Sequence, residues 1–237
     1  MVVGVPVGRV AAVLRYPVKS MAAESVADVD VSWHGLAGDR RWAFVRPDLS
    51  GNGFPWLTLR QRNDLNDYQP GWADPDRPDA SSVLVRTPAG AQFDVTSPDL
   101  AAELGAGVRV MKVNRGTFDT MPLSLITTRT VEQLGMLLGR ELSALRFRPN
   151  LVIEPFSAAA FPEDEWVGRD LMVGTTAIRI DARDQRCVVV NVDPVTGRRD
   201  PKVLSAISAH RESCLGVYGS TLRPGRVAVG DDVVLQS

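Results

Sequence analysis

The chain has 237 residues, and its 27 Lys and Arg against 28 Asp and Glu give a formal net charge of -1. This length is enough for one large or two small domains with a substantial core, and the balanced charge gives no indication that nucleic acid or a membrane surface is the main partner. The two cysteines and two histidines are scattered along the chain, which argues against a structural zinc site and a disulfide framework.

The first twenty residues, MVVGVPVGRVAAVLRYPVKS, lack the basic start, continuous apolar core and small-residue cleavage site of a secretory signal. No stretch approaches the roughly 18 consecutive apolar residues that a membrane-spanning helix needs. We therefore expect a soluble cytoplasmic protein.

Strand signals dominate the first half of the chain. Val29, Val31 and Trp33 alternate with polar residues at the period of a half-buried strand. Other apolar runs that predict strands there are 8–17, 40–46, 81–87, 91–95, 108–113 and 122–128. Between 47 and 82 the chain is rich in Pro, Gly, Asp and Asn, and we expect surface loops around one short strand at 56–61, WLTLRQ.

Helix signals are fewer. Ser97 as cap, Pro98 at the first position and Gly105 as a stop predict a short helix. Spaced apolar residues predict a second over 128–142 with Thr128 as its cap, and a third, shorter helix is expected over 201–210. Strands at 213–220, 225–230 and 231–237 then complete a mainly β chain with a few helices, an α+β protein of two joined β-rich units.

Cys187 has two readings. The apolar run VVVNV that follows it is expected to form a strand, and an isolated Cys at the start of an apolar strand is most often a packed core residue. Arg183 and Arg186 precede it, however, and nearby cations favour the thiolate that a nucleophile or a ligand of a soft metal needs. Neither His34, in a Gly-rich turn, nor His210, at a helix end, is placed beside it by the sequence, so Cys–His catalysis has weak support.

The acidic residues of two segments are expected to have structural roles and not catalytic ones. Asp193 stands in a turn sequence, DPVTG, where a carboxylate accepts backbone N–H bonds. The segment FPEDEW, 161–166, is expected to be a solvated loop anchored by Trp166, without a pair of acid and base carboxylates.

Basic residues recur at the ends of apolar segments, and there they can converge on one anion. They are Lys19, Arg40, Arg41, Arg60, Arg146, Arg148 and Arg186. A phosphate-bearing ligand is expected; pyridoxal phosphate is a weak alternative. The glycine motifs of dinucleotide-binding folds and P-loops are missing from the sequence.

Several motifs, in order, resemble those of MOSC-domain proteins, in the branch of the mitochondrial amidoxime reducing component and its bacterial relatives. They are YPVKS (16–20), GLAGDRRW (35–42), FDTMPLSLIT (118–127), RFRPNLVI (146–153), DEWVG (164–168), RCVVVNVDPVTG (186–197) and GVYG followed by PGRVAVGDDVVL (216–235). The resemblance implies an N-terminal β-rich MOSC domain, placed at 1–105, packed on a MOSC β-barrel domain at 106–237. It also implies a molybdenum cofactor, a molybdenum pterin held between the two domains.

The resemblance further assigns roles to single residues. The family's Cys in the R-C motif ligates molybdenum, and Cys187 occupies that place as metal ligand and catalytic residue. Cofactor-binding roles fall by motif match on Lys19, Ser20, Arg40, Thr120, Arg148, Asn150 and Arg186. Gln185 departs from the Ser or Thr that is usual in this branch two positions before the Cys.

The function implied is a molybdenum-cofactor oxidoreductase that reduces small N-hydroxylated substrates. The chain lacks the cysteine spacing of the plant-type iron–sulfur domain fused to some bacterial relatives, so a separate electron-donor protein, a flavoprotein or an iron–sulfur protein, is expected. The alternative from another class is a non-catalytic module that binds or carries the cofactor or a persulfide on Cys187. A third alternative treats Cys187 as core in a small-ligand binder without the metal.

Overall fold

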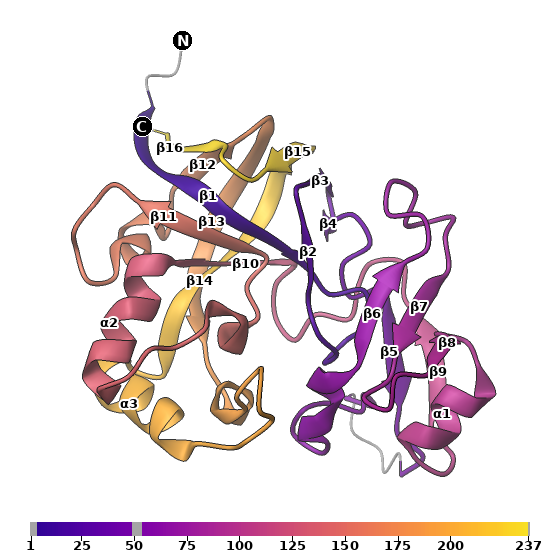
Figure 1. The fold of residues 1–237 in the computed structure, drawn as a ribbon. Helices are drawn as coiled ribbons and strands as arrows, with labels where there is room; N and C mark the ends of the chain where they lie inside the picture. Colours follow the sequence, from indigo (N-terminus) through magenta and orange to yellow (C-terminus); the bar gives the residue numbers. More distant parts are fainter. Residues whose placement is uncertain (1–3, 49–53, 237) are drawn as a thin grey trace.

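The computed structural model describes residues 4–48 and 54–236. Its larger part is a closed β-barrel (Figure 1). Around the barrel the strands follow the order β11 (Leu151–Pro155), β10 (Leu123–Thr127), β14 (Cys214–Arg223), β13 (Thr176–Gln185), β12 (Asp170–Val173), β16 (Asp232–Leu235) and β1 (Val5–Arg15). Strand β1 then pairs antiparallel with β11 and closes the ring. Strand β2 (Glu24–Val26) pairs antiparallel with the C-terminal end of β1.

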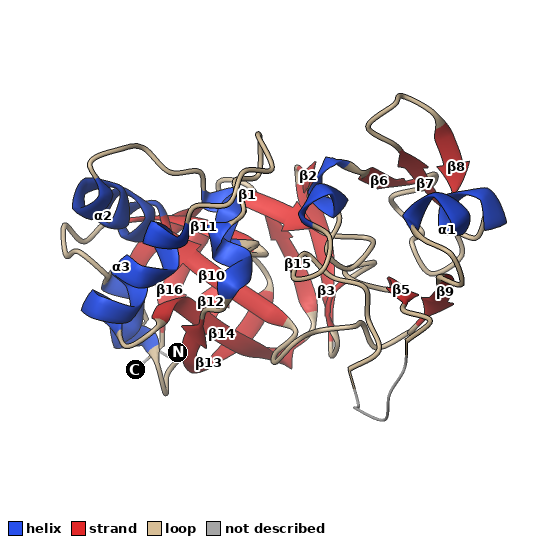
Figure 2. Ribbon diagram, turned by 90° about the horizontal axis from the view of Figure 1, so that it is seen from below, coloured by secondary structure: helices blue, strands red, loops and turns tan. Residues whose placement is uncertain are grey.

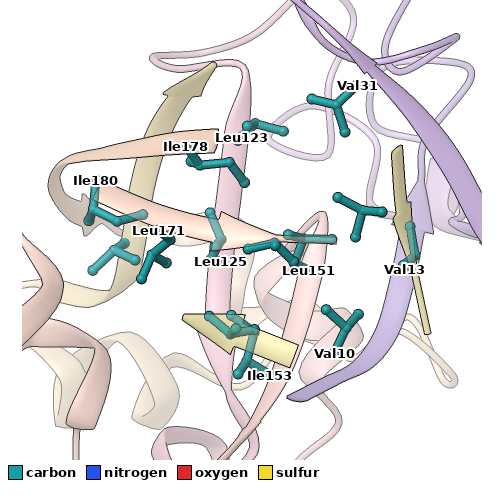
Figure 3. Close-up of a cluster of buried hydrophobic side chains, with 14 of the residues drawn as sticks. Val10, Val13, Val31, Leu123, Leu125, Leu151, Ile153, Leu171, Ile178 and Ile180 are labelled. Carbon is teal, nitrogen blue, oxygen red and sulfur yellow. The ribbon is translucent and has the colours of Figure 1, made fainter. Parts of the chain in front are cut away.

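Inward-facing aliphatic side chains fill the barrel. Val10 and Val13 from β1 meet Leu123 and Leu125 from β10 and Ile178 from β13, all 2% exposed or less (Figure 3). Val and Ile suit this position because branched side chains pack well on a pleated surface. The filled interior means that a ligand site must lie outside the barrel core.

Two helices cover one side of the barrel (Figure 2). Strands β10 and β11 are parallel, and a parallel pair needs a crossover, which α2 (Thr128–Leu138) and the 3-10 helix η2 (Ala144–Phe147) supply. Helix α3 (Pro201–Arg211), capped by Asp200, packs beside α2. The cap of α2 is Thr127, not the predicted Thr128, because the Thr127 hydroxyl accepts the N–H of Thr130.

A second unit lies beside the barrel (Figures 1 and 2). It contains the pair β5 (Trp42–Val45) and β9 (Arg109–Lys112), and the sheet β6 (Gln69–Trp72), β7 (Val83–Arg86) and β8 (Gln92–Asp94). The predicted helix α1 (Pro98–Leu104), with Ser97 as its cap, and η1 (Asn63–Asp67) complete it around a separate core.

A small sheet joins distant parts of the chain. It combines β3 (Asp28–Ser32) and β4 (Gly35–Leu36) with β15 (Gly225–Ala228) near the C-terminus. The chain therefore starts in the barrel, passes through the second unit and returns to the barrel. The mainly β, α+β class expected from the sequence is confirmed, while the division between residues 105 and 106 stays a prediction.

Two strand predictions are wrong, one for most of a segment and one at the end of a strand. The segment 56–61 forms a turn, because the Thr58 carbonyl accepts the N–H groups of Gln61 and Arg62; only Trp56 makes an isolated bridge. Trp33 is not part of the buried alternation and is 64% exposed, since β3 ends at Ser32, whose hydroxyl accepts the N–H of His34. His34 lies in the turn between β3 and β4, as predicted.

Two further segments differ from expectation. The apolar run after Cys187 forms the 3-10 helix η4 (Val188–Asn191) and not a strand, because the pairing of β13 with β14 ends at Gln185 and Cys214 and leaves no partner strand. The segment FPEDEW is the 3-10 helix η3 (Pro162–Trp166) and is not solvated throughout: Glu163 is 0% exposed. No helix within 4–48 and 54–236 is long and apolar enough to cross a membrane.

Candidate functional site

A cavity of about 190 Å³, partly open to solvent, is lined by residues of both units. The second unit contributes Thr58 and Arg60, and the barrel side contributes the loops and strand ends around β10, η2 and β13. All eight residues that the motifs singled out lie on its wall: Lys19, Ser20, Arg40, Thr120, Arg148, Asn150, Arg186 and Cys187. The fold thus brings together residues that are far apart in the sequence, from Lys19 to Cys187.

The wall carries far more positive than negative charge. Its basic side chains are Lys19, Arg40, Arg60, Arg146, Arg148 and Arg186, and its acidic side chains are Asp119 and Asp184. The predicted convergence of strand-end cations is therefore present, with the exception of Arg41, which is buried elsewhere. Such a surplus in a recessed site attracts an anion, because the surrounding low dielectric strengthens each interaction.

Tyr16 holds two of these cations together. The guanidinium carbons of Arg40 and Arg148 lie 4.5 and 4.4 Å from the centre of its ring, which is 1% exposed. The negative face of an aromatic ring attracts a cation, so Tyr16 offsets part of the repulsion between the two guanidinium groups. Burial raises the pKa of the Tyr16 hydroxyl to about 12, although Arg148 and Arg40 act in the opposite direction. The ring therefore stays neutral.

Three wall residues have left-handed backbone: Ser20 with φ 69°, Arg40 with φ 49° and Arg148 with φ 52°. Among the described residues only Glu212 and Ser213 share this conformation without being glycine. Such strain costs about 1 kcal/mol or more per residue and persists where the surroundings enforce it, often at functional sites. Here hydrogen bonds enforce it: the Arg40 N–H donates to Tyr16 O at 2.6 Å, and the Arg148 N–H to Leu145 O at 3.1 Å.

Burial shifts two cations of the wall toward easier deprotonation. Desolvation lowers the pKa of Arg148 to about 10, with Tyr16 opposing and Arg40 adding to the effect. Desolvation also lowers the pKa of the Lys19 ammonium, although Asp119 opposes it. The Lys19 ammonium donates to Thr117 O at 2.5 Å and to the carboxylate of Asp119. A bound anion would relieve both costs.

Cys187 follows the end of β13 and is half-buried with a free thiol. The cation at its sulfur is Arg60, whose Nη2 lies 3.3 Å from Sγ and 3.2 Å from Asp119 Oδ2. The predicted neighbour Arg183 is wrong for this role, because it pairs with Glu212 at 2.9 Å and with Asp164. The turn at 56–61, which was predicted as a strand, is what carries Arg60 to this position.

Arg186 is fixed by the backbone of two other segments. Its Nε donates to Leu215 O and its Nη1 to Phe147 O, both at 2.7 Å, and its Nη2 lies 2.8 Å from Asp184 Oδ2. Gly216 makes room for it, since a Cβ there would lie 3.2 Å from Nη2 and 2.7 Å from Leu125 O. The Arg186 guanidinium is therefore held in one position, and it carries its positive charge on the residue next to Cys187.

Asn150 positions neighbouring residues of the site through its hydrogen bonds. Its Oδ1 accepts the Ser124 N–H at 3.2 Å and an Arg40 N–H at 3.4 Å, and its Nδ2 donates to Asp39 at 3.0 Å and to Leu14 O at 3.3 Å. All its polar groups are thus used within the protein. Asn150 holds Arg40 and the paired Asp39 in place.

Sequence reasoning missed the acidic and phenolic members of the wall. Asp119 precedes the predicted Thr120, and it pairs with both Lys19 and Arg60. Although burial opposes its ionisation, Lys19 and Arg60 prevail and lower the pKa of its carboxyl. Asp184 and Tyr218 also line the cavity, on the neighbouring strands β13 and β14. The sequence offered one signal for each of them. Asp119 lies in the motif FDTMPLSLIT, Tyr218 lies in the motif GVYG, and Asp184 lies three residues before Cys187.

No three His, Cys, Asp or Glu side chains in the described ranges are grouped so that they could hold a metal ion by themselves. Gln185, the departure from the usual Ser or Thr, is exposed and lies on the cavity wall.

Curated relatives match part of the chain. Mitochondrial amidoxime-reducing component 1 from Mus musculus is 30% identical over 130 residues, which cover 49% of this chain and 37% of that protein. Molybdenum cofactor sulfurase from Drosophila grimshawi is 25% identical over 249 residues, covering 87% of this chain and 31% of that protein. The chain thus spans only about a third of the length of these relatives.

A solved structure shares the whole fold. The YuaD protein from Bacillus subtilis covers 100% of this chain with a TM-score of 0.56 and 13% identity. Two family models match in succession: the MOSC N-terminal beta barrel domain over residues 7–121 and the MOSC domain over 112–234. Together with the cavity between the two units, these matches show that the chain belongs to the MOSC domain family.

Proposed function

We propose that this protein is a molybdenum-cofactor oxidoreductase that reduces small N-hydroxylated compounds. The observation that carries the proposal is the convergence, in one cavity, of the free Cys187 thiol with six basic side chains from both units. The relatives named amidoxime-reducing components support the choice of reaction.

The residues present fit a phosphate-bearing, thiolate-ligated cofactor. Thiolates are good ligands for soft and borderline metals, and the free Cys187 thiol has the Arg60 guanidinium 3.3 Å from its sulfur. Lys19, Arg40 and Arg148 form the cationic end of the cavity, and guanidinium groups bind phosphate through paired hydrogen bonds. The cavity therefore offers a thiol for the metal of the expected cofactor and a group of cations for its phosphate.

Each residue has a distinct part in the proposed reaction. Cys187 would be the metal ligand; Lys19, Ser20, Arg40, Thr120, Arg148 and Arg186 would hold the cofactor; and Asn150 would hold Arg40. When bound, the molybdenum cofactor would supply the two electrons that break the N–O bond of the substrate. Those electrons would reach it from a separate electron-donor protein.

A second candidate is a non-catalytic module that carries the cofactor or a persulfide on Cys187. It is favoured by one observation, the match of 87% of this chain to a molybdenum cofactor sulfurase. In that case the same cationic wall would retain the cofactor without turnover, and Cys187 would hold sulfur and not metal.

The first test measures molybdenum by elemental mass spectrometry and pterin by fluorescence in protein from a cofactor-producing host. Wild type is compared with Cys187→Ala and with the matched control Cys214→Ala, which removes the other free, half-buried thiol. We expect near-stoichiometric molybdenum in wild type and the control, and a loss of about tenfold or more in folded Cys187→Ala.

The second test measures reduction of a hydroxylamine compound with an artificial electron donor. Turnover by wild type, absent in Cys187→Ala, supports the oxidoreductase. Bound molybdenum pterin without turnover supports the carrier. Folded wild-type protein that repeatedly lacks both molybdenum and pterin, although the host makes abundant cofactor, refutes both.

A further inference from the structure

Arg60 reaches the Cys187 sulfur from the other unit, and the proposed function gives it no task. Its Nη2 nitrogen donates to two acceptors, Cys187 Sγ at 3.3 Å and Asp119 Oδ2 at 3.2 Å. The guanidinium carbon also lies over the ring of Phe54, 5.5 Å from its centre. Groups from separate parts of the chain therefore fix the position of this cation beside the sulfur.

Other cations near Cys187 in the sequence are engaged elsewhere. The guanidinium of Arg186, the preceding residue, contacts two main-chain carbonyls and Asp184. Arg183 pairs with Glu212 at 2.9 Å. The hydrogen bond that the sulfur accepts within the described ranges thus comes from Arg60, and it depends on the packing of the two units.

The main chain at Arg60 is held from the barrel side by Arg199. Arg199 Nη2 donates to Leu59 O at 2.8 Å and lies 3.4 Å from Arg60 O. Hydrogen bonds from a charged donor are stronger than those between neutral groups. Arg199 itself lies outside the cavity lining that the described residues form. It can therefore act on the site only through the turn that carries Arg60.

The loop 193–199, which contains Arg199, is bonded to the same part of the second unit at two further points. Asn63 Nδ2 donates to Gly197 O and Asn66 Nδ2 to Pro194 O, both at 2.8 Å. The loop is also closed on itself, because the N–H at position 193 donates to the carbonyl at position 198 at 2.8 Å. A closed loop with several bonds to its neighbour is a firm support for the turn at 56–61.

We propose that Arg60 is a positioning residue that holds the Cys187 sulfur by a hydrogen bond and lowers the electron density it gives to a bound metal, and that Arg199 keeps Arg60 in place. The inference rests on the proposed function, in which Cys187 is the metal ligand. A hydrogen bond to a ligating sulfur raises the reduction potential of the metal, because it stabilises the more electron-rich state. Arg60 thereby favours the uptake of electrons from the separate electron-donor protein.

The first test needs no metal. The full chain is made in a host without the cofactor, and Cys187 is alkylated with iodoacetate, an anion, or with neutral iodoacetamide, while mass spectrometry follows both rates. Both reagents react with the same form of the sulfur, so the ratio of their rates reports the charge around it. Removal of one unit charge at about 4 Å predicts a fall of about fivefold in this ratio for Arg60→Gln, even with the screening of bulk water. Cys214, the other half-buried thiol, is the internal control.

Arg199→Gln tests the positioning. It leaves every residue of the cavity wall in place but removes the bonds to Leu59 O and Arg60 O, so the ratio should fall toward that of Arg60→Gln. Arg198→Gln is the matched control, because Arg198 is exposed and its hydrogen bonds among the described residues are made by its main chain. This control removes the same charge from the same loop and should leave the ratio unchanged.

The second test measures the midpoint potential of bound molybdenum at equal molybdenum content, by redox titration followed by electron paramagnetic resonance. Arg60→Gln should shift the equilibrium about tenfold toward the oxidised metal, which is a potential about 59 mV lower for one electron. Arg199→Gln should shift it in the same direction, and Arg198→Gln should not shift it. Urea midpoints of the three variants show any general loss of stability, which by itself does not move a potential.

The outcomes separate the two proposals. An unchanged alkylation ratio or an unchanged potential in Arg60→Gln refutes the role of Arg60 and leaves the oxidoreductase standing. Equal effects of Arg198→Gln and Arg199→Gln refute the positioning by Arg199. A wild type that never takes up molybdenum refutes the oxidoreductase, and with it the effect of Arg60 on the metal, whatever the ratio. If Arg60→Gln does not fold, Arg199→Gln decides: an unchanged ratio refutes the arrangement.

Discussion

Replacing Tyr16 tests whether the cationic end of the cavity is held by its ring. Tyr16→Phe keeps the ring between Arg40 and Arg148 but removes a buried hydroxyl that has no partner among the described residues. Because an unsatisfied buried hydroxyl costs about 1–3 kcal/mol, we expect the free energy of unfolding to stay within about 1 kcal/mol of wild type or to rise.

Tyr16→Leu removes both ring contacts, at 4.5 and 4.4 Å. A desolvated cation–π contact is worth about 2 kcal/mol, so two give a loss of about 4 kcal/mol, with the smaller volume of Leu adding to it. Left without the ring, the two guanidinium groups also repel each other more strongly.

The assay is urea unfolding of the wild type and both variants, followed by tryptophan fluorescence. At a slope of about 3 kcal/mol per molar urea, the midpoint of Tyr16→Leu should fall by about 1 M or more, while that of Tyr16→Phe should not fall. Equal losses in the two variants would mean that the hydroxyl and not the ring matters. A loss below about 1 kcal/mol in Tyr16→Leu would refute the cation–π argument.

Three further outcomes follow from the structure. Burial raises the pKa of Glu163 despite hydrogen bonds from Thr130 and Thr127; its contribution to stability is therefore full below the unfolded pKa and is lost as pH rises through the raised folded value. The difference in urea midpoint between Glu163→Gln and wild type should accordingly grow in favour of the variant as pH rises from about 4 to 8, and a pH-independent difference contradicts this. Leu125→Ala, in the barrel core at 0% exposure, should cost about 2–5 kcal/mol, whereas Leu137→Ala, 44% exposed on α2, should cost under about 0.5 kcal/mol by the same assay. Ser97→Ala should cost about 1 kcal/mol because the Ser97 hydroxyl accepts the N–H of Asp99 at the start of α1; no change in the midpoint would show that this cap is not needed.

The sequence predicted the local structure where neighbouring residues decide it. Ser97, Pro98 and Gly105 define α1 because capping and stop signals act within one helical turn. Asp193 accepts the N–H groups of Val195 and Thr196, as its turn sequence indicated. The errors at 56–61 and 188–191 have one cause: an apolar run becomes a strand only if a partner strand is available, and neither run has one along its length.

The motifs also identified the eight residues predicted for the site, because each motif keeps its residue types at fixed local spacing, and all eight line one cavity. What the sequence by itself determined was therefore the fold class, the cap of α1 and the candidates for the cationic wall. Only the tertiary structure decided which cation faces Cys187: it is Arg60, 127 positions away, and not Arg183. It likewise decided that the buried Asp184 carboxyl group lies against Arg186 and accepts the Ser124 hydroxyl. Such contacts depend on strand register and on the packing of the two units, which no local pattern encodes, since a carboxyl or guanidinium group acquires its chemistry from the neighbours that folding brings to it.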